Sequence, residues 1–231
     1  MFPGFEVFDI APQGVRVHAR RGGSGPALLL LHGHPQTMAM WHRVAPALAE
    51  RFTVVLADLR GYGDSERVAD DAGHLAYSKR TMAGDMLGLM QAQGFARFAV
   101  LAHDRGARVA HRLALDHPEA ASRLMLLDIA PTLAMYESTN EAFARAYWHW
   151  FFLIQPAPLP ERLIEADPEG YLRDLMGTRS AGLVPFAPES LHQRRSGEDL
   201  VHARDHAALL PALSLQGRLG LPVQVREREV Q

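Results

Sequence analysis

Residues 98–108 read FAVLAHDRGAR, and this stretch decides the fold. The apolar run Phe98–Ala102 is typical of a strand that is covered on both faces, and a helical pattern follows over Gly106–Asp116. Between them, residues 102–106 place a small residue, any residue, Asp104, any residue and a glycine in that order. This is the pattern of a nucleophile elbow, a sharp strand-to-helix turn that exposes its central side chain above a sheet. The sequence therefore predicts Asp104 as a carboxylate nucleophile.

Working outward from the elbow, short apolar runs alternate with helical patterns. This alternation predicts the α/β class, a mostly parallel sheet with helices on both faces, and ligands of such sheets bind at the carboxyl ends of the strands. The further expected elements are strands at Ala27–Leu31, Thr53–Ala57 and Leu124–Leu127, a hairpin of Phe5–Asp9 and Val15–Arg20, and a helix over Tyr77–Gln93.

The amino-acid composition of the chain changes after residue 131. From Thr132 to about Leu191 it is aromatic and proline-rich, which we interpret as a helical lid. The remainder carries many arginines and lacks a sustained apolar period, except for a possible short strand at Pro222–Val225. We therefore divide the chain into an α/β core over 1–131, a helical lid (cap) over 132–191 and an atypical C-terminal segment over 192–231.

The composition excludes several classes of protein. With 48% hydrophobic and 22% charged residues, the 231-residue chain has the composition of an ordered globular protein. Its net charge of −2 argues against nucleic acid as a partner. It has no cysteine, which excludes disulfides and thiolate metal sites. No stretch is apolar enough for a membrane span or a signal peptide, so we expect a cytoplasmic protein.

An aspartate nucleophile narrows the chemistry. It attacks carbon and leaves an alkyl ester on the enzyme, which suits halide displacement or epoxide opening rather than acyl transfer. A lone His-Asp-Arg-Gly is more often a surface turn or a salt bridge. However, His32-Gly33-His34-Pro35 follows an expected strand about 70 residues earlier. Hydrolases of this architecture build one half of an oxyanion hole there, so we expect donors at the backbone N–H groups of His34 and Arg105.

A second glycine-containing loop follows the expected strand at residues 53–57. Asp58–Ser65 imitates the start of a dinucleotide fingerprint, but Glu66 occupies the required third glycine position. We interpret it as a structural loop near the pocket, and no motif of the chain calls for a cofactor or a metal.

Arg105 and Arg108 lie in the first turn of the expected helix, where cations oppose the helix dipole unless an anion is present. Asp104 itself could be that anion. Two guanidinium groups can also hold a substrate carboxylate through paired N–H donors. The alternative is that one arginine pairs only with Asp104 or with lid carboxylates.

Together, five motifs resemble the haloacetate (fluoroacetate) dehalogenases, which belong to the α/β-hydrolase superfamily. They are His32–Thr37, Asp58–Ser65, His103–Arg108, Leu127–Thr132 and Tyr147–Trp150, in one order and within the first 190 residues or so. The resemblance implies that Asp104 displaces the halide while Arg105 and Arg108 hold the carboxylate of the substrate. Related haloalkane dehalogenases and many epoxide hydrolases typically have Trp after the nucleophile, so Arg105 implies an anionic haloacid as substrate.

The resemblance also implies roles for three further residues. His149 and Trp150 would donate N–H bonds to the departing halide, although an aromatic run at a domain boundary is usually packing. Asp128 would orient the catalytic histidine of the family, although it could equally be a turn or cap residue.

The chain departs from the family after the lid. The fold still needs two strands and a histidine after the last of them, but no histidine follows His206 and no tyrosine follows Tyr171. His202 and His206 could share a helix face, even as a weak metal site, but a solvated face is the better interpretation. We expect missing final strands from a truncated or frame-shifted gene, at most one turnover per chain, and association through an unpaired sheet edge, which includes a possible homodimer.

Two other functions stay open at this point. One is an epoxide hydrolase that uses the same Asp104. The other is a non-catalytic carboxylate-binding protein that keeps Arg105 and Arg108.

Overall fold

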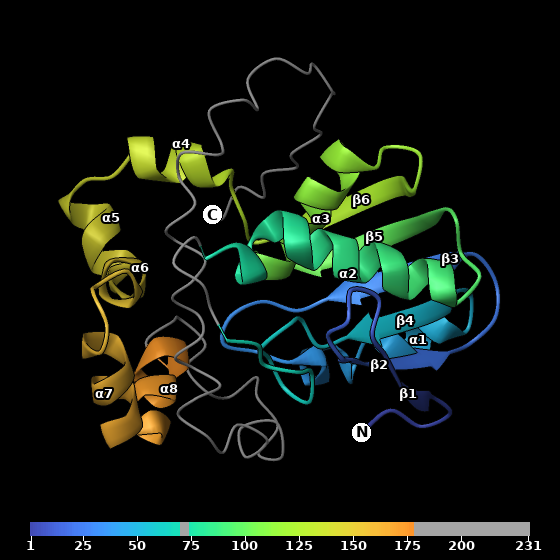
Figure 1. The fold of residues 1–231 in the computed structure, drawn as a ribbon, viewed down its shortest axis with the longest axis horizontal. Helices are drawn as coiled ribbons and strands as arrows, with labels where there is room; N and C mark the ends of the chain where they lie inside the picture. Colours follow the sequence, from blue (N-terminus) through green and yellow to red (C-terminus); the bar gives the residue numbers. More distant parts are fainter. Residues whose placement is uncertain (70–73, 178–231) are drawn as a thin grey trace, which may run out of the picture.

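The computed structural model describes residues 1–69 and 74–177. A six-stranded sheet in the order β1-β2-β4-β3-β5-β6 forms its centre (Figure 1). β3, β4, β5 and β6 run parallel, whereas β1 and β2 pair antiparallel at one edge. The strands are β1 (Glu6–Ile10), β2 (Val17–Gly22), β3 (Ala27–Leu31), β4 (Thr53–Ala57), β5 (Phe98–His103) and β6 (Ala121–Leu127).

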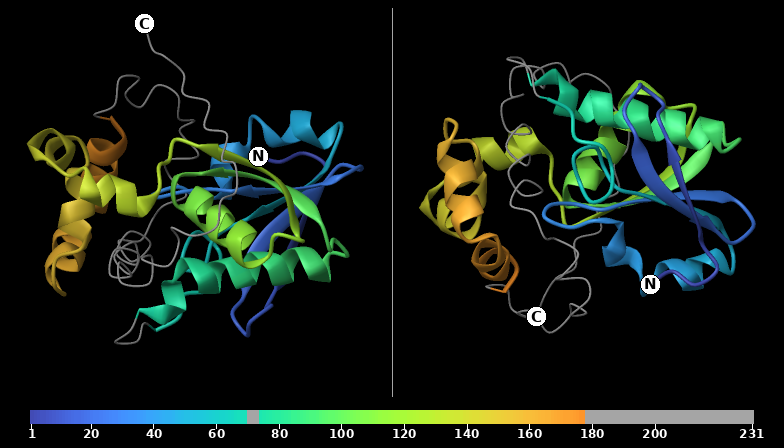
Figure 2. Two further views of the ribbon diagram at one scale, coloured as in Figure 1. Left: turned by 90° about the horizontal axis from the view of Figure 1, so that it is seen from above. Right: turned by 60° about the horizontal axis from the view of Figure 1, so that its bottom comes forward.

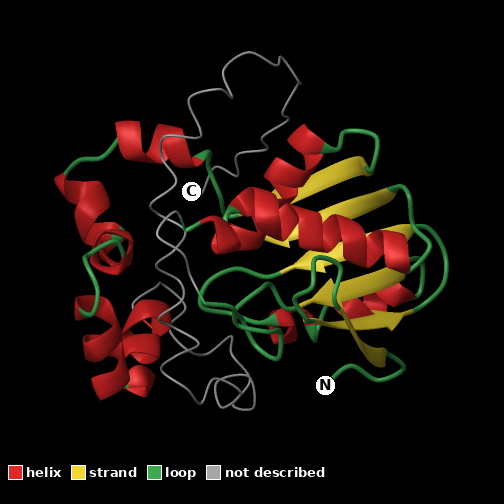
Figure 3. Ribbon diagram, viewed as in Figure 1, coloured by secondary structure: helices red, strands yellow, loops and turns green. Residues whose placement is uncertain are grey.

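Helices cover both faces of this sheet (Figure 3). On one face, α2 (Lys79–Ala92) and α3 (Asp104–Asp116) pack their apolar side chains, such as Met86 and Leu113, against the larger core cluster. On the other face, η1 (Met38–Trp41) and α1 (Ala45–Ala49) pack Trp41 against the strands. The predicted α/β fold, a mostly parallel sheet between helices, is therefore confirmed.

The parallel strands at the centre are buried because neighbours cover both of their faces. Every residue of β3 and β4 is buried, which explains why both strands read as uninterrupted apolar runs. β6 differs, because its residues from Ser122 to Met125 are exposed. The strand begins at Ala121, three residues before the expected start at Leu124. The sequence did not indicate this start because the exposed positions Ser122 and Arg123 are polar and interrupt the apolar run.

Five short helices follow β6 and form a separate group beside the sheet in both views of Figure 2. Leu153, Ile164, Leu172 and Met176 make a small core of their own within this group. The helices are α4 (Thr132–Glu137), α5 (Glu141–Ala146), α6 (Trp148–Leu153), α7 (Leu159–Ala166) and α8 (Pro168–Gly177).

These five helices lie in the segment that we interpret as a lid, and the division into domains remains a prediction. Residues 178–191 of the predicted lid and the atypical segment 192–231 lie outside the described residues. The same holds for the expected strand at 222–225, for the pair His202 and His206, and for the expectation of missing final strands.

Candidate active site

The strand-to-helix turn predicted at Asp104 is present. β5 ends at His103 and α3 begins at Asp104, which has a left-handed backbone conformation with φ 46°. Such a conformation is uncommon in a residue other than glycine and marks a tight turn. Gly106 makes this turn possible, because a Cβ atom at its position would collide with the carbonyl oxygen of His32 and with Leu31. The turn brings Asp104 against the loop that follows β3.

The His34 backbone contacts the predicted nucleophile directly. Its N–H donates a hydrogen bond of 2.9 Å to Oδ1 of Asp104. Gly33 allows this approach, since a Cβ atom there would lie 2.5 Å from the Cβ of Asp104. The structure therefore brings His34 and Asp104 together as the sequence predicts. That the backbone N–H of Arg105 is the second donor of the oxyanion hole remains a prediction.

The surroundings of Asp104 favour its ionised form. Burial raises the pKa of the carboxyl group, but the charge of Arg105, the His34 hydrogen bond and the charges of Arg108 and His103 lower it. Burial is the largest single effect, but the four lowering effects together exceed it, so the pKa of Asp104 lies below its usual value. A carboxylate with a lowered pKa is available as a nucleophile at neutral pH.

Arg108 on α3 contacts two of the helices that follow β6. Its guanidinium carbon lies 4.3 Å from the centre of the Trp150 ring, and its Nη2 lies 3.5 Å from the sulfur of Met135. Burial lowers the pKa of Arg108 to about 10, against the opposing effect of Asp104, so the group stays protonated at neutral pH. The Nε–H of Arg108 is buried and has no hydrogen-bond partner, so it remains available as a donor.

A cavity of about 360 Å³ lies between the turn and the lid. Asp104, Arg105 and His34 line it from the core, and His149 and Trp150 line it from α6. The structure thus brings the predicted nucleophile, one predicted carboxylate-binding arginine and both predicted halide donors to one space. Six other lining residues belong to the five motifs, although the sequence analysis gave them no individual role: Pro35, Gln36, His103, Ile129, Ala130 and Tyr147. The sequence did not indicate the remaining three, Met135, Leu175 and Met176.

Asp128 also lines this cavity, directly after β6. It has φ 50°, and its Oδ2 lies 3.9 Å from Nε2 of His103. Because β5 and β6 are parallel and His103 pairs with Leu127, both side chains stand at the same end of the sheet. Asp128 therefore faces an imidazole, that of His103, which the sequence analysis did not single out.

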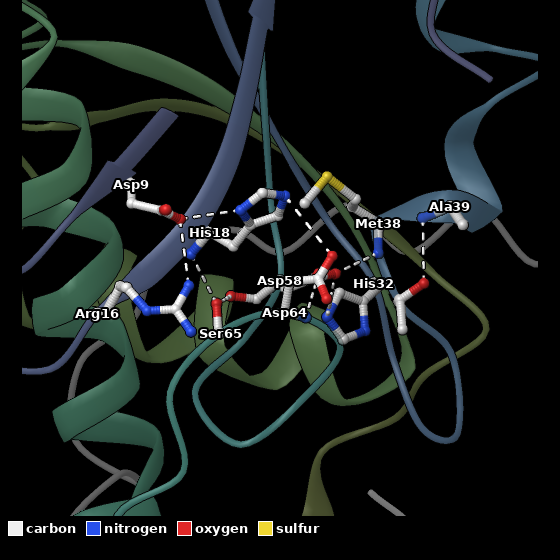
Figure 4. Close-up of polar contacts among 10 residues, drawn as sticks. Asp9, Arg16, His18, His32, Met38, Ala39, Asp58, Asp64 and Ser65 are labelled. Carbon is white, nitrogen blue, oxygen red and sulfur yellow. Dashed lines mark hydrogen bonds and ion pairs between the residues drawn. The ribbon is translucent and has the colours of Figure 1, made fainter. Parts of the chain in front are cut away.

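The loop after β4 supports the loop that carries His34 (Figure 4). Oδ1 of the buried Asp58 accepts a hydrogen bond of 2.7 Å from the Met38 N–H, and its Oδ2 accepts one of 3.1 Å from the Asp64 N–H. Burial raises the pKa of Asp58 to about 6, although both hydrogen bonds lower it. Asp58–Ser65 is thus the structural loop that the sequence indicates, and it contacts the His34 loop.

Two further features bear on the function. An open groove of about 620 Å³ near His18 and Asp64 shares no residue with the cavity of Asp104. Among residues 1–69 and 74–177, no three His, Cys, Asp or Glu side chains are grouped so that they could hold a metal ion.

Residues 26–175 match the model of the alpha/beta hydrolase fold family. The chain belongs to this family. Over 196 residues, the chain is 50% identical to a fluoroacetate dehalogenase of Burkholderia sp., a match that covers 84% of this chain and 64% of the dehalogenase. It is 39% identical to a soluble epoxide hydrolase of Corynebacterium sp. over 77% of this chain and 62% of that enzyme. The resemblance inferred from the five motifs is thereby confirmed.

Solved structures agree with this assignment. ALR0039 from Nostoc sp. PCC 7120 is 50% identical to this hydrolase and superposes with a TM-score of 0.84, over 90% of this chain and 72% of that one. The epoxide hydrolase CorEH, at 32% identity, superposes with a TM-score of 0.80 over 90% and 75% of the two chains. By contrast, the chain spans less than two thirds of the length of the two curated relatives named above. Across the described residues, none of its helices is long and apolar enough to cross a membrane.

Proposed function

We propose that this hydrolase cleaves the carbon–halogen bond of haloacetates through an alkyl ester on Asp104. The observation that carries the proposal is the placement of an ionised carboxylate at a cavity that Arg105 also lines, with the charge of Arg108 acting on the same carboxylate. A nucleophile accompanied by two cations suits a substrate that is itself an anion with a leaving group. The 50% identity to a fluoroacetate dehalogenase supports the same substrate class.

The first step is a displacement at the carbon that carries the halogen. Because the His34 N–H occupies Oδ1 of Asp104, Oδ2 is the oxygen that attacks. A new bond forms between Oδ2 and carbon, the carbon–halogen bond breaks, and its electron pair leaves with the halide ion. The product on the enzyme is a carboxymethyl ester of Asp104.

Arg105 and Arg108 position the substrate for this attack. Arg105 lines the cavity, and its guanidinium would donate to the substrate carboxylate. The buried, unpartnered Nε–H of Arg108 on the same helix would be the second donor, so that the neighbouring carbon is held in line with Asp104. The same two charges keep the nucleophile ionised.

His149 and Trp150 act on the leaving group. Both line the cavity from α6, and their ring N–H groups can donate to the halide as its negative charge develops. Fluoride depends most on such donors because it forms the strongest hydrogen bonds of the halide ions.

The second step is hydrolysis of the ester. Water attacks the carbonyl carbon of Asp104, the His34 and Arg105 N–H groups stabilise the oxyanion, and glycolate leaves as the carboxylate is restored. This step needs a base that accepts a proton from water.

Two alternatives have their own support. The 39% identity to a soluble epoxide hydrolase favours epoxide opening by the same Asp104, and it predicts turnover of neutral epoxides. A non-catalytic carboxylate-binding protein would bind acetate without releasing halide from any haloacid. Arg105 and Arg108 favour the anionic substrate over the neutral epoxide.

One experiment separates these functions. The purified chain is incubated with fluoroacetate or chloroacetate. We then measure the halide released per chain and the mass of the peptide that contains Asp104. Asp104→Asn is the control. We expect halide release and a carboxymethyl group on Asp104 in the wild-type chain, and neither in Asp104→Asn. An absence of both halide and adduct would contradict the proposed function.

A further inference from the structure

His32 immediately precedes Gly33 and His34, whose backbone contacts Asp104. Its imidazole is fully buried and contacts two backbone groups. Its Nε2 lies 3.0 Å from the N–H of Leu59, and its Nδ1 lies 3.0 Å from the carbonyl oxygen of Gly33. A nitrogen that accepts an N–H bond carries no hydrogen, so the ring hydrogen is on Nδ1 and is donated to Gly33. The neighbours of His32 thus fix its tautomer.

The Gly33 carbonyl belongs to the same peptide unit as the N–H of His34. Because a peptide unit is planar, a constraint on its oxygen also sets the direction of its N–H. The Gly33 oxygen accepts from His32 and also from the Gln36 N–H at 2.8 Å, while the His34 N–H donates to Asp104 at 2.9 Å. The peptide therefore has hydrogen bonds at both ends.

We infer that His32 is a positioning residue for the reaction, which aims the His34 N–H at Oδ1 of Asp104 through the Gly33–His34 peptide. It is absent from the lining of the cavity, so it would act without contacting the substrate. Figure 4 shows the neighbouring support: Asp58, whose Oδ1 lies 3.8 Å from Nε2 of His32, holds the far end of the loop at Met38.

The inference rests on the proposed function of Asp104 and deepens it. The His34 hydrogen bond lowers the pKa of Asp104 and leaves Oδ2 to attack. If the peptide turns away, Asp104 loses this donor, and the oxyanion formed during ester hydrolysis loses it as well. The effect of His32 should therefore be visible in the titration of Asp104 before any reaction takes place.

The test measures the pKa of Asp104 directly, by the carboxyl ¹³C chemical shift in protein labelled at aspartate and assigned with Asp104→Asn. His32→Phe keeps a ring of similar size without nitrogen donors. We expect the midpoint for Asp104 to rise by about one pH unit, since a backbone hydrogen bond to the charged form is lost. The charges that face Asp104 on α3 and β5, those of Arg105, Arg108 and His103, are unchanged, and the titration of Asp58 is followed in the same spectra.

His42→Phe is the matched control. Nδ1 of His42 also contacts a backbone oxygen, that of Ala39 at 2.9 Å, but this contact lies within the turn of η1 and not at the Gly33–His34 peptide. We expect the Asp104 midpoint of this variant to match the wild type. A shift of equal size in both variants would mean that any disturbed histidine near the loop suffices, and it would overturn the inference.

His32→Asn keeps an N–H donor near the position of Nδ1 and provides a second, milder variant. We expect a smaller rise in the Asp104 midpoint than in His32→Phe, which amounts to partial rescue. If His32→Phe folds with the wild-type circular dichroism spectrum and shows no shift, the inference is wrong. Because the titration needs no reaction, that result is distinct from a failure of Asp104 to be alkylated, which would contradict the proposed function.

Discussion

The guanidinium of Arg108 lies over the ring of Trp150, with its carbon 4.3 Å from the ring centre. Arg108 belongs to α3 of the core and Trp150 to α6 of the lid. A residue proposed to hold the substrate carboxylate is therefore in contact with one proposed to receive the halide. Such a cation–π contact contributes about 0.5–2 kcal/mol, depending on how far it is desolvated. It links the lid to the core at the point where substrate would bind.

Trp150→Phe separates the ring of Trp150 from its N–H. The ring remains under Arg108, but the donor to the leaving halide is lost. A hydrogen bond to a charged group contributes about 1.5–3 kcal/mol, so fluoride release from fluoroacetate should slow by about 10- to 100-fold. Bromide release should change much less, since bromide accepts hydrogen bonds weakly. Equal losses for both substrates in a halide-release assay would argue against a donor role.

Arg108→Met tests recognition of the carboxylate. We expect the alkylation rate with chloroacetate to fall by at least about tenfold, because a charge-assisted donor pair is removed. Alkylation by chloroacetamide, which has no charge, should be nearly unaffected. Arg145→Met on α5 is the control, since Arg145 is exposed and pairs with Glu141. A parallel loss for both substrates would show that Arg108 supports the fold rather than the anion.

Gly33→Ala tests the close approach of the oxyanion loop. The added methyl group would lie 2.5 Å from the Cβ of Asp104, so the nucleophile must move. A nucleophile displaced by about 1 Å can lose about 10²-fold in rate, and we expect a decrease of that order in the alkylation of Asp104. Gly14→Ala is the control, because it strains a left-handed turn in open space. If Gly33→Ala were alkylated at the wild-type rate, the tight contact would have no function.

The pH dependence of alkylation follows from the lowered pKa of Asp104. A carboxylate with a lowered pKa stays ionised until the pH falls through that value, so the rate should be constant down to and below the ordinary value of 3.8. Arg105 is the largest of the effects that lower the pKa. In Arg105→Gln the midpoint should therefore move to higher pH. A midpoint that is unchanged in a stopped-time mass assay would refute this account of the electrostatics.

The buried ion pair of Arg60 and Asp85 provides a test of stability away from the cavity. Two bonds of 2.9 and 2.8 Å join them, and Asp85 is fully buried. Asp85→Ala leaves a buried guanidinium without its partner, so we expect the free energy of unfolding to fall by about 3–5 kcal/mol in urea titrations. Glu169→Ala removes an exposed pair with Arg173 and should cost less than about 1 kcal/mol. If the two variants lost similar free energies of unfolding, burial would not be the reason that the Arg60–Asp85 pair stabilises the fold.

Much of the fold was predictable because the central strands are buried on both faces. Ala27–Leu31 and Thr53–Ala57 were predicted with the bounds that the structure shows, since burial requires an unbroken apolar run. The helix expected over 77–93 begins at Lys79, because the Ser78 side chain caps it by accepting the Thr81 N–H. The start of β6 was missed because exposed positions carry little pattern.

The site was predictable where a motif fixes the backbone and unpredictable where the fold brings distant side chains together. The turn at Asp104 and the His34 donor follow from glycines at fixed spacing. The ring contact of Arg108, the approach of His103 to Asp128 and the Met38 hydrogen bond to Asp58 depend on how lid, strands and loops pack. No local pattern in the sequence encodes those distances.

The central claim is that Asp104 attacks the halogen-bearing carbon of a haloacetate. The most direct measurement is the mass of the peptide that contains Asp104 after a single exposure to chloroacetate, followed by fragmentation to locate the modified residue. The account predicts a carboxymethyl ester on Asp104 in the wild-type chain and an unmodified peptide in Asp104→Asn. An unmodified Asp104 in a folded chain, or a carboxymethyl group on another residue with equal halide release, would contradict it.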